Sequence, residues 1–251
     1  MQTTRRLRTA IAVAVAATLV AVGAAAPASA ALVYANNFDS AATLGAGVTA
    51  TGLTNGSLGT ATGSYGGSGG KSWASNFFFN ASTGNPATAS TLTLSNLGAH
   101  SHVSIDMMLG FLNSWDSSNG SVAPDYLDIY IDGNLAYKLT TIIASGSVND
   151  HGGGTLVVDN GQIDGSQFFA DDLVDMGTAS FLTFAHTAST LTLTFQASGA
   201  GWQGGVDENW GVDSLSINTR GGGTVPEPGT WGLVAIAGLA AAAARRRRIA
   251  A

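Results

Sequence analysis

The chain contains no cysteine, so no disulfide can hold the fold together and the hydrophobic core must do so unaided. Charge is scarce as well, since Asp, Glu, Lys and Arg together make up 10% of the 251 residues. Between residues 31 and 224 the only basic residues are Lys71, Lys138 and Arg220. Fifteen acids in the same stretch give a balance of −12. Such an acidic body excludes binding to nucleic acid or to an anionic membrane surface, and it favours divalent cations.

The same stretch lacks any ten-residue segment with the periodicity of an amphipathic helix. Apolar and polar residues alternate instead, which is typical of half-buried strands, in the runs 91–94, 103–109, 127–131 and 190–195. Asp132-Gly133-Asn134 is a hairpin turn, and residues 135–140 form its returning strand. Less regular runs predict further strands at 32–38, 73–79, 155–158, 180–183 and 212–217. These many short strands, joined by glycine-rich loops, predict an all-β fold, a single antiparallel β-sandwich of the jelly-roll type.

Long apolar runs occur only near the two ends of the chain. At the N-terminus, the basic residues Arg5, Arg6 and Arg8 precede an apolar segment at 10–23. The small residues Ala28 and Ala30 then bracket Ser29 in the pattern that signal peptidase cleaves. Residues 1–30 are therefore a predicted secretory signal peptide.

The second apolar run lies at the C-terminus, in residues 225–251. Pro226, Glu227 and Pro228 form a turn that no helix can cross, and an uncharged run at 230–244 follows. Fifteen helical residues reach about 22 Å, which is short of the roughly 30 Å hydrocarbon core. The next four residues, Arg245, Arg246, Arg247 and Arg248, can extend the span by snorkelling, and they keep that end in the cytoplasm. The alternative, a basic tail after a core helix, would need a polar helix face, and the run has none. The tail is therefore a predicted single transmembrane helix with the body outside.

A Pro-Glu-Pro turn, an apolar helix and an arginine cluster, in this order, resemble the PEP-CTERM sorting signal of Gram-negative bacteria. The resemblance implies that exosortase, a membrane processing enzyme, recognises the tail and cleaves it near Pro226, Glu227 and Pro228. It also implies a membrane-anchored intermediate and delivery to the cell surface or to an exopolysaccharide matrix. The predicted organisation is a signal peptide at 1–30, a β-sandwich at 31–224 and the sorting signal at 225–251.

The body resembles exported jelly-roll sandwiches related to concanavalin A-like lectins and carbohydrate-binding modules. The resemblance rests on short pieces spread over the body, namely Asn37-Phe38-Asp39, residues 97–103, residues 113–116, Pro124-Asp125, Asp132-Gly133 and residues 208–215. In such modules an acid from the first strand and one from the last often hold a structural calcium ion. Asp39 and Asp213 occupy those places here. The residues alone leave open that these acids are solvated loop or turn residues.

Two segments place a tryptophan beside carboxylates, Trp115-Asp116 and the stretch from Trp210 to Asp213. A sugar site needs an aromatic face and polar groups for the hydroxyls, so Trp115, Asp116, Trp202 and Trp210 are the candidate ligand-binding residues. The alternative is that these tryptophans belong to the core. Similarly, His100 and His102 could share one strand face and bind zinc, although no third ligand can be chosen.

The sequence offers little for catalysis. Glu208 is the only glutamate between residues 31 and 224, whereas glycoside hydrolysis needs two carboxyls flanking the bond. No Gly-x-Ser-x-Gly elbow is present for an esterase. We therefore expect a non-enzymatic surface or matrix protein that interacts with exopolysaccharide. A purely structural envelope protein and a glycan-active hydrolase are the alternatives.

Overall fold

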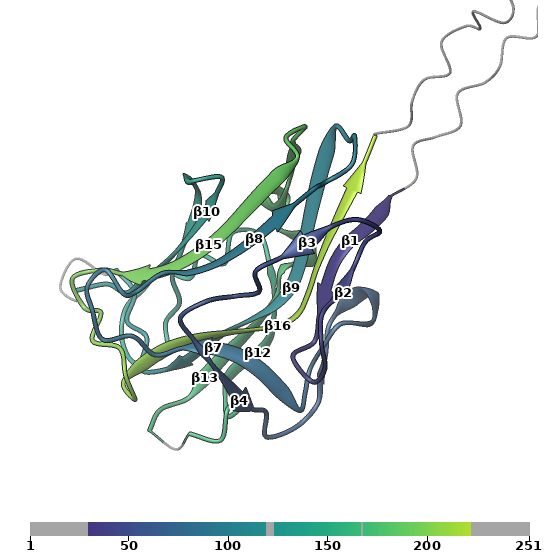
Figure 1. Ribbon diagram of the computed structural model, residues 1–251. Helices are drawn as coiled ribbons and strands as arrows, with labels where there is room; N and C mark the ends of the chain where they lie inside the picture. Colours follow the sequence, from purple (N-terminus) through teal and green to yellow (C-terminus); the bar gives the residue numbers. More distant parts are fainter. Residues whose placement is uncertain (1–29, 119–122, 167, 222–251) are drawn as a thin grey trace, which may run out of the picture. The chain divides into compact units, whose positions relative to one another are not determined.

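The computed structural model describes residues 30–118, 123–166 and 168–221. These residues form two facing antiparallel sheets (Figure 1). Helical structure in the described part of the chain is limited to three 3₁₀ turns, η1 (Ser68–Gly70), η2 (Met176–Thr178) and η3 (Ser180–Leu182). The all-β sandwich predicted from the alternation is thus confirmed.

The larger sheet has nine strands, and the smaller has five. The path of the larger sheet is β12 (Thr155–Gly161), β13 (Asp171–Asp175), β9 (His102–Asn113), β16 (Glu208–Arg220), β1 (Ala31–Asn36) and β2 (Thr43–Leu44). Three further strands join it: β14 (Thr183–Ala185) on β9, β7 (Asn76–Asn80) on β16 and β4 (Ser57–Thr60) on β7. The smaller sheet has the order β11 (Asn134–Leu139), β10 (Tyr126–Ile131), β15 (Thr190–Ser198), β8 (Ser90–Ser95) and β3 (Thr49–Ala50). A separate two-stranded ribbon joins β5 (Tyr65–Gly66) to β6 (Ser72–Trp73). The chain passes repeatedly from one sheet to the other, as in jelly rolls.

The two longest strands, β9 and β16, lie side by side in the middle of the larger sheet. Shorter strands lie end to end along them, with β7 and β1 on the free side of β16 and β13 and β14 on the free side of β9. The register of β16 shifts between Asp213 and Ser216, where Ser214 has a φ of 48°. The hydroxyl of Ser214 bonds both the N–H and the carbonyl of Ser72. This irregularity separates β7 from β1 and brings β6 against the sheet.

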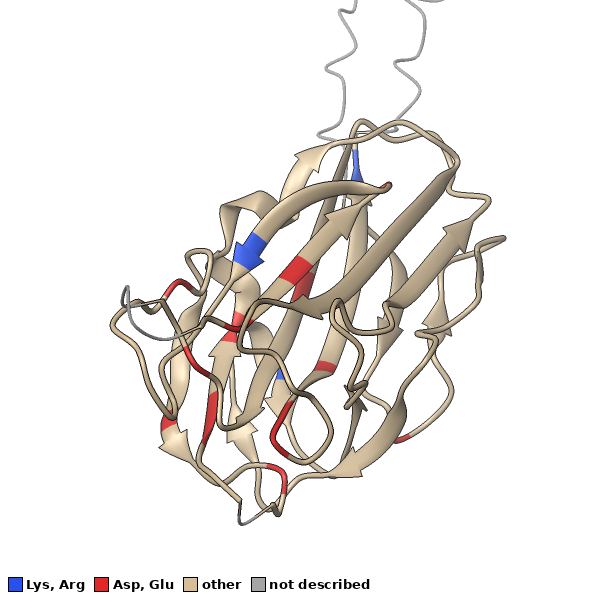
Figure 2. Cartoon of the chain, turned by 90° about the vertical axis from the view of Figure 1, so that its left-hand side faces the viewer, with Lys and Arg blue, Asp and Glu red and all other residues tan. Residues whose placement is uncertain are grey.

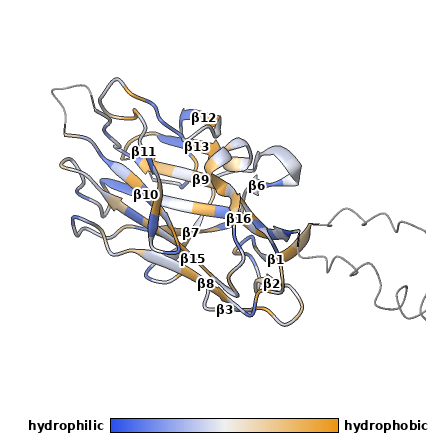
Figure 3. Cartoon of the chain, turned by 90° about the horizontal axis from the view of Figure 1, so that it is seen from above, coloured by the Kyte–Doolittle hydropathy of each residue, from blue (hydrophilic) through white to orange (hydrophobic). Residues whose placement is uncertain are grey.

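The main core fills the space between the sheets. Leu92, Leu94, Leu191, Leu193 and Phe195 face inward and are buried, while the intervening threonines point outward. Figure 3 shows hydrophobic residues along β8, β9 and β15. The outer face of the larger sheet carries a second cluster, made of Trp73, Phe77, Met108, Leu112, Ile163 and Leu173. Because β9 is covered on both faces, its second half reads as an almost continuous apolar run.

The structure differs from the predicted strands in three segments. No strand is predicted at Asp171 and Asp172, which begin the fully buried strand β13. The strand predicted at 73–79 is two strands, because Ser75 has a φ of 54° and interrupts it. The strand predicted at 180–183 is the turn η3, and only its last residue enters β14.

No helix within the described ranges is long and apolar enough to cross a membrane. Residues 1–29 of the predicted signal peptide, with Ala28 as a cleavage residue, and the predicted transmembrane helix at the C-terminus lie outside those ranges, and Ala30 is the first described residue.

Candidate functional site

The three tryptophans proposed as sugar-binding residues lie in the core. Trp115 and Trp210 have no exposed surface, and Trp202 is 4% exposed. The indole of Trp115 meets that of Trp202 edge to face, with 5.4 Å between ring centroids. Trp210 packs against Phe195 at 5.1 Å. A sugar ring needs an open aromatic face, and these packed rings present none, so the core alternative describes their surroundings.

Hydrogen bonds fix two of these indoles from within. Trp115 donates its Nε1–H to the carbonyl of Asn209 at 2.8 Å, and Trp202 donates to the carbonyl of Ser82 at 3.2 Å. Asp116, the fourth predicted ligand residue, is half-buried beside Trp115, and its backbone N–H bonds Asp125 Oδ2 at 2.7 Å. The structure therefore packs the indole rings of Trp115 and Trp202 together with Asp116 beside them, and sugar binding by these residues stays a prediction.

Asp39 and Asp213, the predicted calcium pair, lie near the ribbon segment that follows β6. Asp213 is buried, and its Oδ2 accepts the N–H of Ala74 at 2.9 Å. Its Oδ1 accepts the N–H of Ser214. Burial raises the pKa of Asp213 to about 7, those two N–H groups oppose the rise, and the negative charge of Asp39 adds to it. The pair is thus close enough for its charges to interact.

The contacts of this pair fit calcium poorly. Asp39 Oδ1 accepts the N–H of Asn76 at 2.9 Å, and its Oδ2 accepts the side chain of Asn37 at 3.3 Å. All four carboxylate oxygens of the pair therefore already face N–H donors of the chain, whereas a calcium ligand faces the cation. Across the described residues, no three His, Cys, Asp or Glu side chains converge to hold a metal ion. Calcium at Asp39 and Asp213 stays a prediction.

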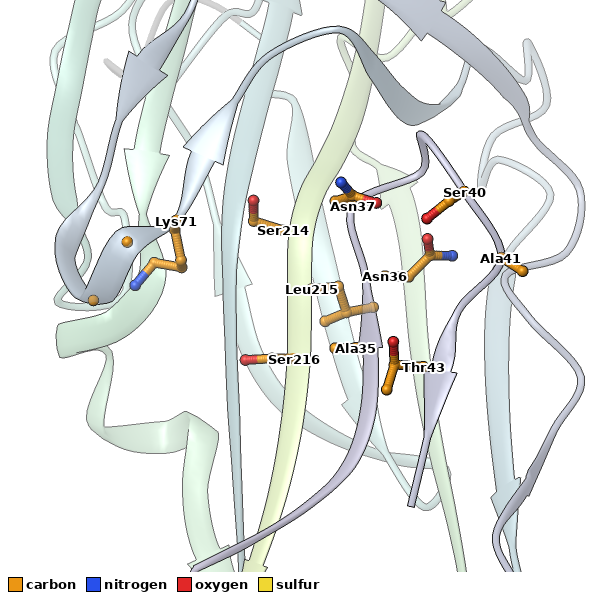
Figure 4. Close-up of a pocket in the computed structure, with 12 residues that line it drawn as sticks. Ala35, Asn36, Asn37, Ser40, Ala41, Thr43, Lys71, Ser214, Leu215 and Ser216 are labelled. Carbon is orange, nitrogen blue, oxygen red and sulfur yellow. The ribbon is translucent and has the colours of Figure 1, made fainter. Parts of the chain in front are cut away.

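An open polar pocket of about 440 Å³ lies where β1, β2 and β16 meet the η1 turn. Its lining consists of Ala35, Asn36, Asn37, Ser40, Ala41, Thr43, Gly69, Gly70, Lys71, Ser214, Leu215 and Ser216. Figure 4 shows Lys71 on one side, Ser214 and Ser216 in the middle, and Asn36, Ser40 and Thr43 on the other. The polar groups of this pocket are hydroxyls, amides and one ammonium, and no carboxyl group lines it. Such a surface suits a neutral, hydroxyl-rich ligand.

Lys71 borders this pocket and is fixed by two carboxylates. Its Nζ lies 2.9 Å from both Asp106 Oδ2 and Asp175 Oδ1, and 3.1 Å from Ser68 Oγ. Burial lowers the pKa of Lys71, but the hydrogen bonds and charges of Asp106 and Asp175 outweigh it, so the net shift is upward. The ammonium therefore stays charged and holds the η1 turn to β9 and β13.

The two histidines of the predicted zinc pair are separated. His102 is exposed and contacts Ser101 Oγ at 2.9 Å. His100 is buried and bonds His186, with 2.7 Å between His100 Nε2 and His186 Nδ1. His186 in turn lies 3.2 Å from Asp132. His186 directly follows β14 and lies 86 residues after His100 in the sequence, so the spacing of the histidines could not reveal this contact.

The C-terminal residues match a known sorting motif. A family model described as the PEP-CTERM protein-sorting motif matches residues 224–248. The chain carries a PEP-CTERM sorting motif. The match includes Pro226, Glu227 and Pro228 and all four residues of the Arg245–Arg248 cluster, and it begins one residue before the predicted boundary at 225. No curated protein matches the chain.

The PEP-CTERM motif supports an exported protein that passes through the membrane and is processed by exosortase, a membrane enzyme. The described sandwich is the part of the chain that precedes this motif. Few basic residues appear on it, and acidic ones are spread over it (Figure 2). The pocket and the acids, and not the tryptophans, are its candidate points of contact.

Proposed function

We propose that this PEP-CTERM protein is a non-enzymatic β-sandwich that resides at the cell surface or in the extracellular matrix and contacts exopolysaccharide through its polar pocket. The observation that carries the proposal is the lining of the pocket at β1, β2 and β16. Hydroxyl groups of Ser40, Thr43 and Ser216 can both donate and accept hydrogen bonds, as sugar hydroxyls do. The amides of Asn36 and Asn37 bond Tyr34, Phe38 and Asp39 within the chain, and each keeps a further N–H and a further lone pair for a ligand. The sorting motif supports an exported location, where a polysaccharide partner would be met.

The same lining argues against a hydrolase. Inverting and retaining glycosidases place two carboxyl groups about 5 to 10 Å apart around the scissile bond. The pocket holds none, and its single charged group, Lys71, is tied to Asp106 and Asp175. A binding role without bond cleavage is therefore the proposal that this surface supports best.

A purely structural envelope protein is the second candidate. The burial of Trp115, Trp202 and Trp210 favours it, because many glycan sites use an exposed aromatic ring. Under this alternative the outer surface would take no specific ligand.

Isothermal titration of the purified protein with the exopolysaccharide of its own host separates the two. We expect saturable heat with calcium present, and at least a fivefold weaker affinity for Asn37→Ala combined with Ser216→Ala. Thr190→Ala on the exposed start of β15, in the opposite sheet, is the matched control and should bind as the unchanged chain does. Absence of heat would leave the structural alternative, and release of reducing sugar ends would instead establish the hydrolase.

A further inference from the structure

Four acidic residues lie in the segments at the end of the sandwich where β9 stops and β16 begins, although no three of their side chains form a metal-binding group by themselves. Asp116 follows the end of β9, Asp125 precedes β10, and Asp207 and Glu208 lead into β16. Their charges interact, since Asp125 is influenced by Glu208, Asp116 and Asp207.

No basic side chain in the described ranges balances this group. Lys71 pairs with Asp106 and Asp175, and Lys138 pairs with Asp128. Arg220 lies at the opposite end of β16. Like charges confined near one another at a partly buried place are unfavourable unless a cation or a proton is shared between them.

Asp125 is buried, and only one of its two carboxylate oxygens accepts a hydrogen bond from the described residues. The residue has no exposed surface, and its Oδ2 accepts the N–H of Asp116 at 2.7 Å. Its Oδ1 is buried and accepts no hydrogen bond from the described chain, and the same is true of Asp116 Oδ1 and Asn209 Oδ1. A buried carboxylate oxygen without a partner loses its hydration with nothing in return.

The surroundings of Asp125 Oδ1 contain a second oxygen, and both lie beside Gly201. A Cβ atom on Gly201 would lie 2.8 Å from Asp125 Oδ1 and 2.1 Å from the carbonyl oxygen of Ala123. Both oxygens therefore pack against Gly201 and lie close to each other, an approach that a side chain at residue 201 would prevent. Two oxygens of this kind, one anionic and one carbonyl, are what a hard cation binds.

The remaining two acids have other contacts and supply charge. Glu208 Oε2 accepts the N–H groups of Gln203 and Gly204 at 2.6 and 2.9 Å. Asp207 Oδ1 accepts the hydroxyl of Ser114. Each shapes the loop before β16 while keeping a negative charge near Asp116 and Asp125.

We propose that this end of the sandwich binds one calcium ion, held by Asp125 Oδ1 and Asp116 Oδ1 together with amide and main-chain oxygens. Calcium takes six to eight oxygens in flexible geometry and accepts carbonyls, amides and water, so a third carboxylate is not needed. Magnesium demands a near-octahedral shell and keeps its water, and it suits this mixed set less well. The ion joins the end of β9, the start of β10 and the loop at Gly201. This site is independent of the polysaccharide contact and lies apart from the Asp39 and Asp213 pair.

Thermal unfolding of the full chain in non-ionic detergent, after EDTA treatment and with calcium chloride alone as the probe, tests the site. We expect the midpoint to rise by about 5 to 10 °C at a calcium concentration near 100 times the dissociation constant. Magnesium chloride at the same concentration should give a clearly smaller rise. Calorimetric titration should give a stoichiometry that falls by one ion in the Asp125→Asn variant.

Asp125→Asn should also unfold at a higher temperature than the unchanged chain in EDTA, because it removes a buried charge, while its calcium-induced rise is lost. Asp116→Asn, at a half-buried position, is the second variant and should weaken calcium binding at least tenfold. Asp39→Asn is the matched control and should keep the full rise. A full rise in both Asp125→Asn and Asp116→Asn, loss of the rise in Asp39→Asn, or no calcium effect on the unchanged chain would overturn the proposal.

Discussion

Lys71 is the side chain on which the largest single-residue effect is expected. Its ammonium is buried between Asp106 and Asp175, so its removal leaves two carboxylates without their cation. We expect Lys71→Ala to lower the free energy of unfolding by about 3 kcal/mol, measured by urea denaturation. Lys138→Ala is the control, since the Lys138 side chain is 41% exposed beside Asp128, and it should cost about 1 kcal/mol or less. Equal losses in the two variants would contradict the role given to Lys71.

The buried acids set the pH dependence of stability. Burial raises the pKa of Asp171 from 3.8 to about 6, and Asp164 adds to the rise while N–H groups of Ile163 and Asn113 oppose it. The folded chain therefore takes up this proton at a higher pH than the unfolded chain does. Stability should rise as the pH falls from 7 toward 4.5.

Asp175 acts in the opposite sense at lower pH. Although burial opposes it, N–H groups of Ser68 and Gly177 and the ammonium of Lys71 lower the pKa of Asp175 to about 2. Its stabilisation is present above pH 3.8 and is lost as the pH falls toward 2. Urea midpoints from pH 8 to pH 2, with EDTA present, should therefore pass through a maximum near pH 4 to 5. Asp171→Asn should flatten the limb above the maximum, and a steady fall from pH 7 would contradict these assignments.

At the level of elements, two glycines leave room for the Trp73 ring to pack on the face of β9 and β16. Gly110 and Gly211 are paired across the two strands. A Cβ atom would lie 2.8 Å from the Trp73 ring at Gly110 and 2.9 Å from it at Gly211. The Trp73 ring also stacks on Phe77, with 4.2 Å between centroids. The second hydrophobic cluster therefore depends on the absence of side chains at Gly110 and Gly211.

Gly211→Ala should destabilise the fold by about 1 to 3 kcal/mol, because the added methyl group collides with Trp73 and with the backbone of Phe78. Gly66→Ala is the matched control, since nothing lies within 4 Å of its Cβ position, and its effect should stay within about 0.5 kcal/mol. Thermal or urea unfolding compares them. An unchanged stability of Gly211→Ala would show that Trp73 moves aside freely.

The elements also show where sequence reasoning works and where it stops. The strands β8 and β15 were predicted because one face is buried and the other faces solvent, so apolar and polar residues alternate in the sequence. β13 was missed because its acids are buried and satisfied by partners remote in sequence, such as the N–H of Asn113 bonding Asp171. The pattern of neighbouring residues does not reveal hydrogen bonds between segments that are far apart in the sequence.

The candidate site was predicted only in part, for the same reason. The sequence brought attention to Trp115, Asp116 and Trp210, and it could not tell which way an indole points once a strand is covered on both faces. The polar pocket joins residues 35–43 with residues 69–71 and 214–216, three segments that only the sheet order brings together. The sorting tail, in contrast, is a continuous motif and was predicted almost to its boundary.

At the scale of the whole molecule, the sandwich and the PEP-CTERM tail have separate roles. The tail supports export and exosortase processing, and the sandwich contains no cysteine, so its fold does not depend on disulfides. Replacing Pro226, Glu227 and Pro228 by alanine should abolish processing without changing the sandwich. The unprocessed chain should then accumulate in the membrane fraction on immunoblots, and unaltered release of the variant would argue against this role of the motif.

The most direct measurement is the intact mass and location of the protein recovered from its host, with and without a functional exosortase. With exosortase present, the expected result is a surface or matrix protein that begins near Ala31 and has lost the residues after the Pro226-Glu227-Pro228 turn. Without exosortase, the longer form should remain in the membrane. A chain found in the cytoplasm with both ends intact would contradict the export and sorting on which every proposed function here depends.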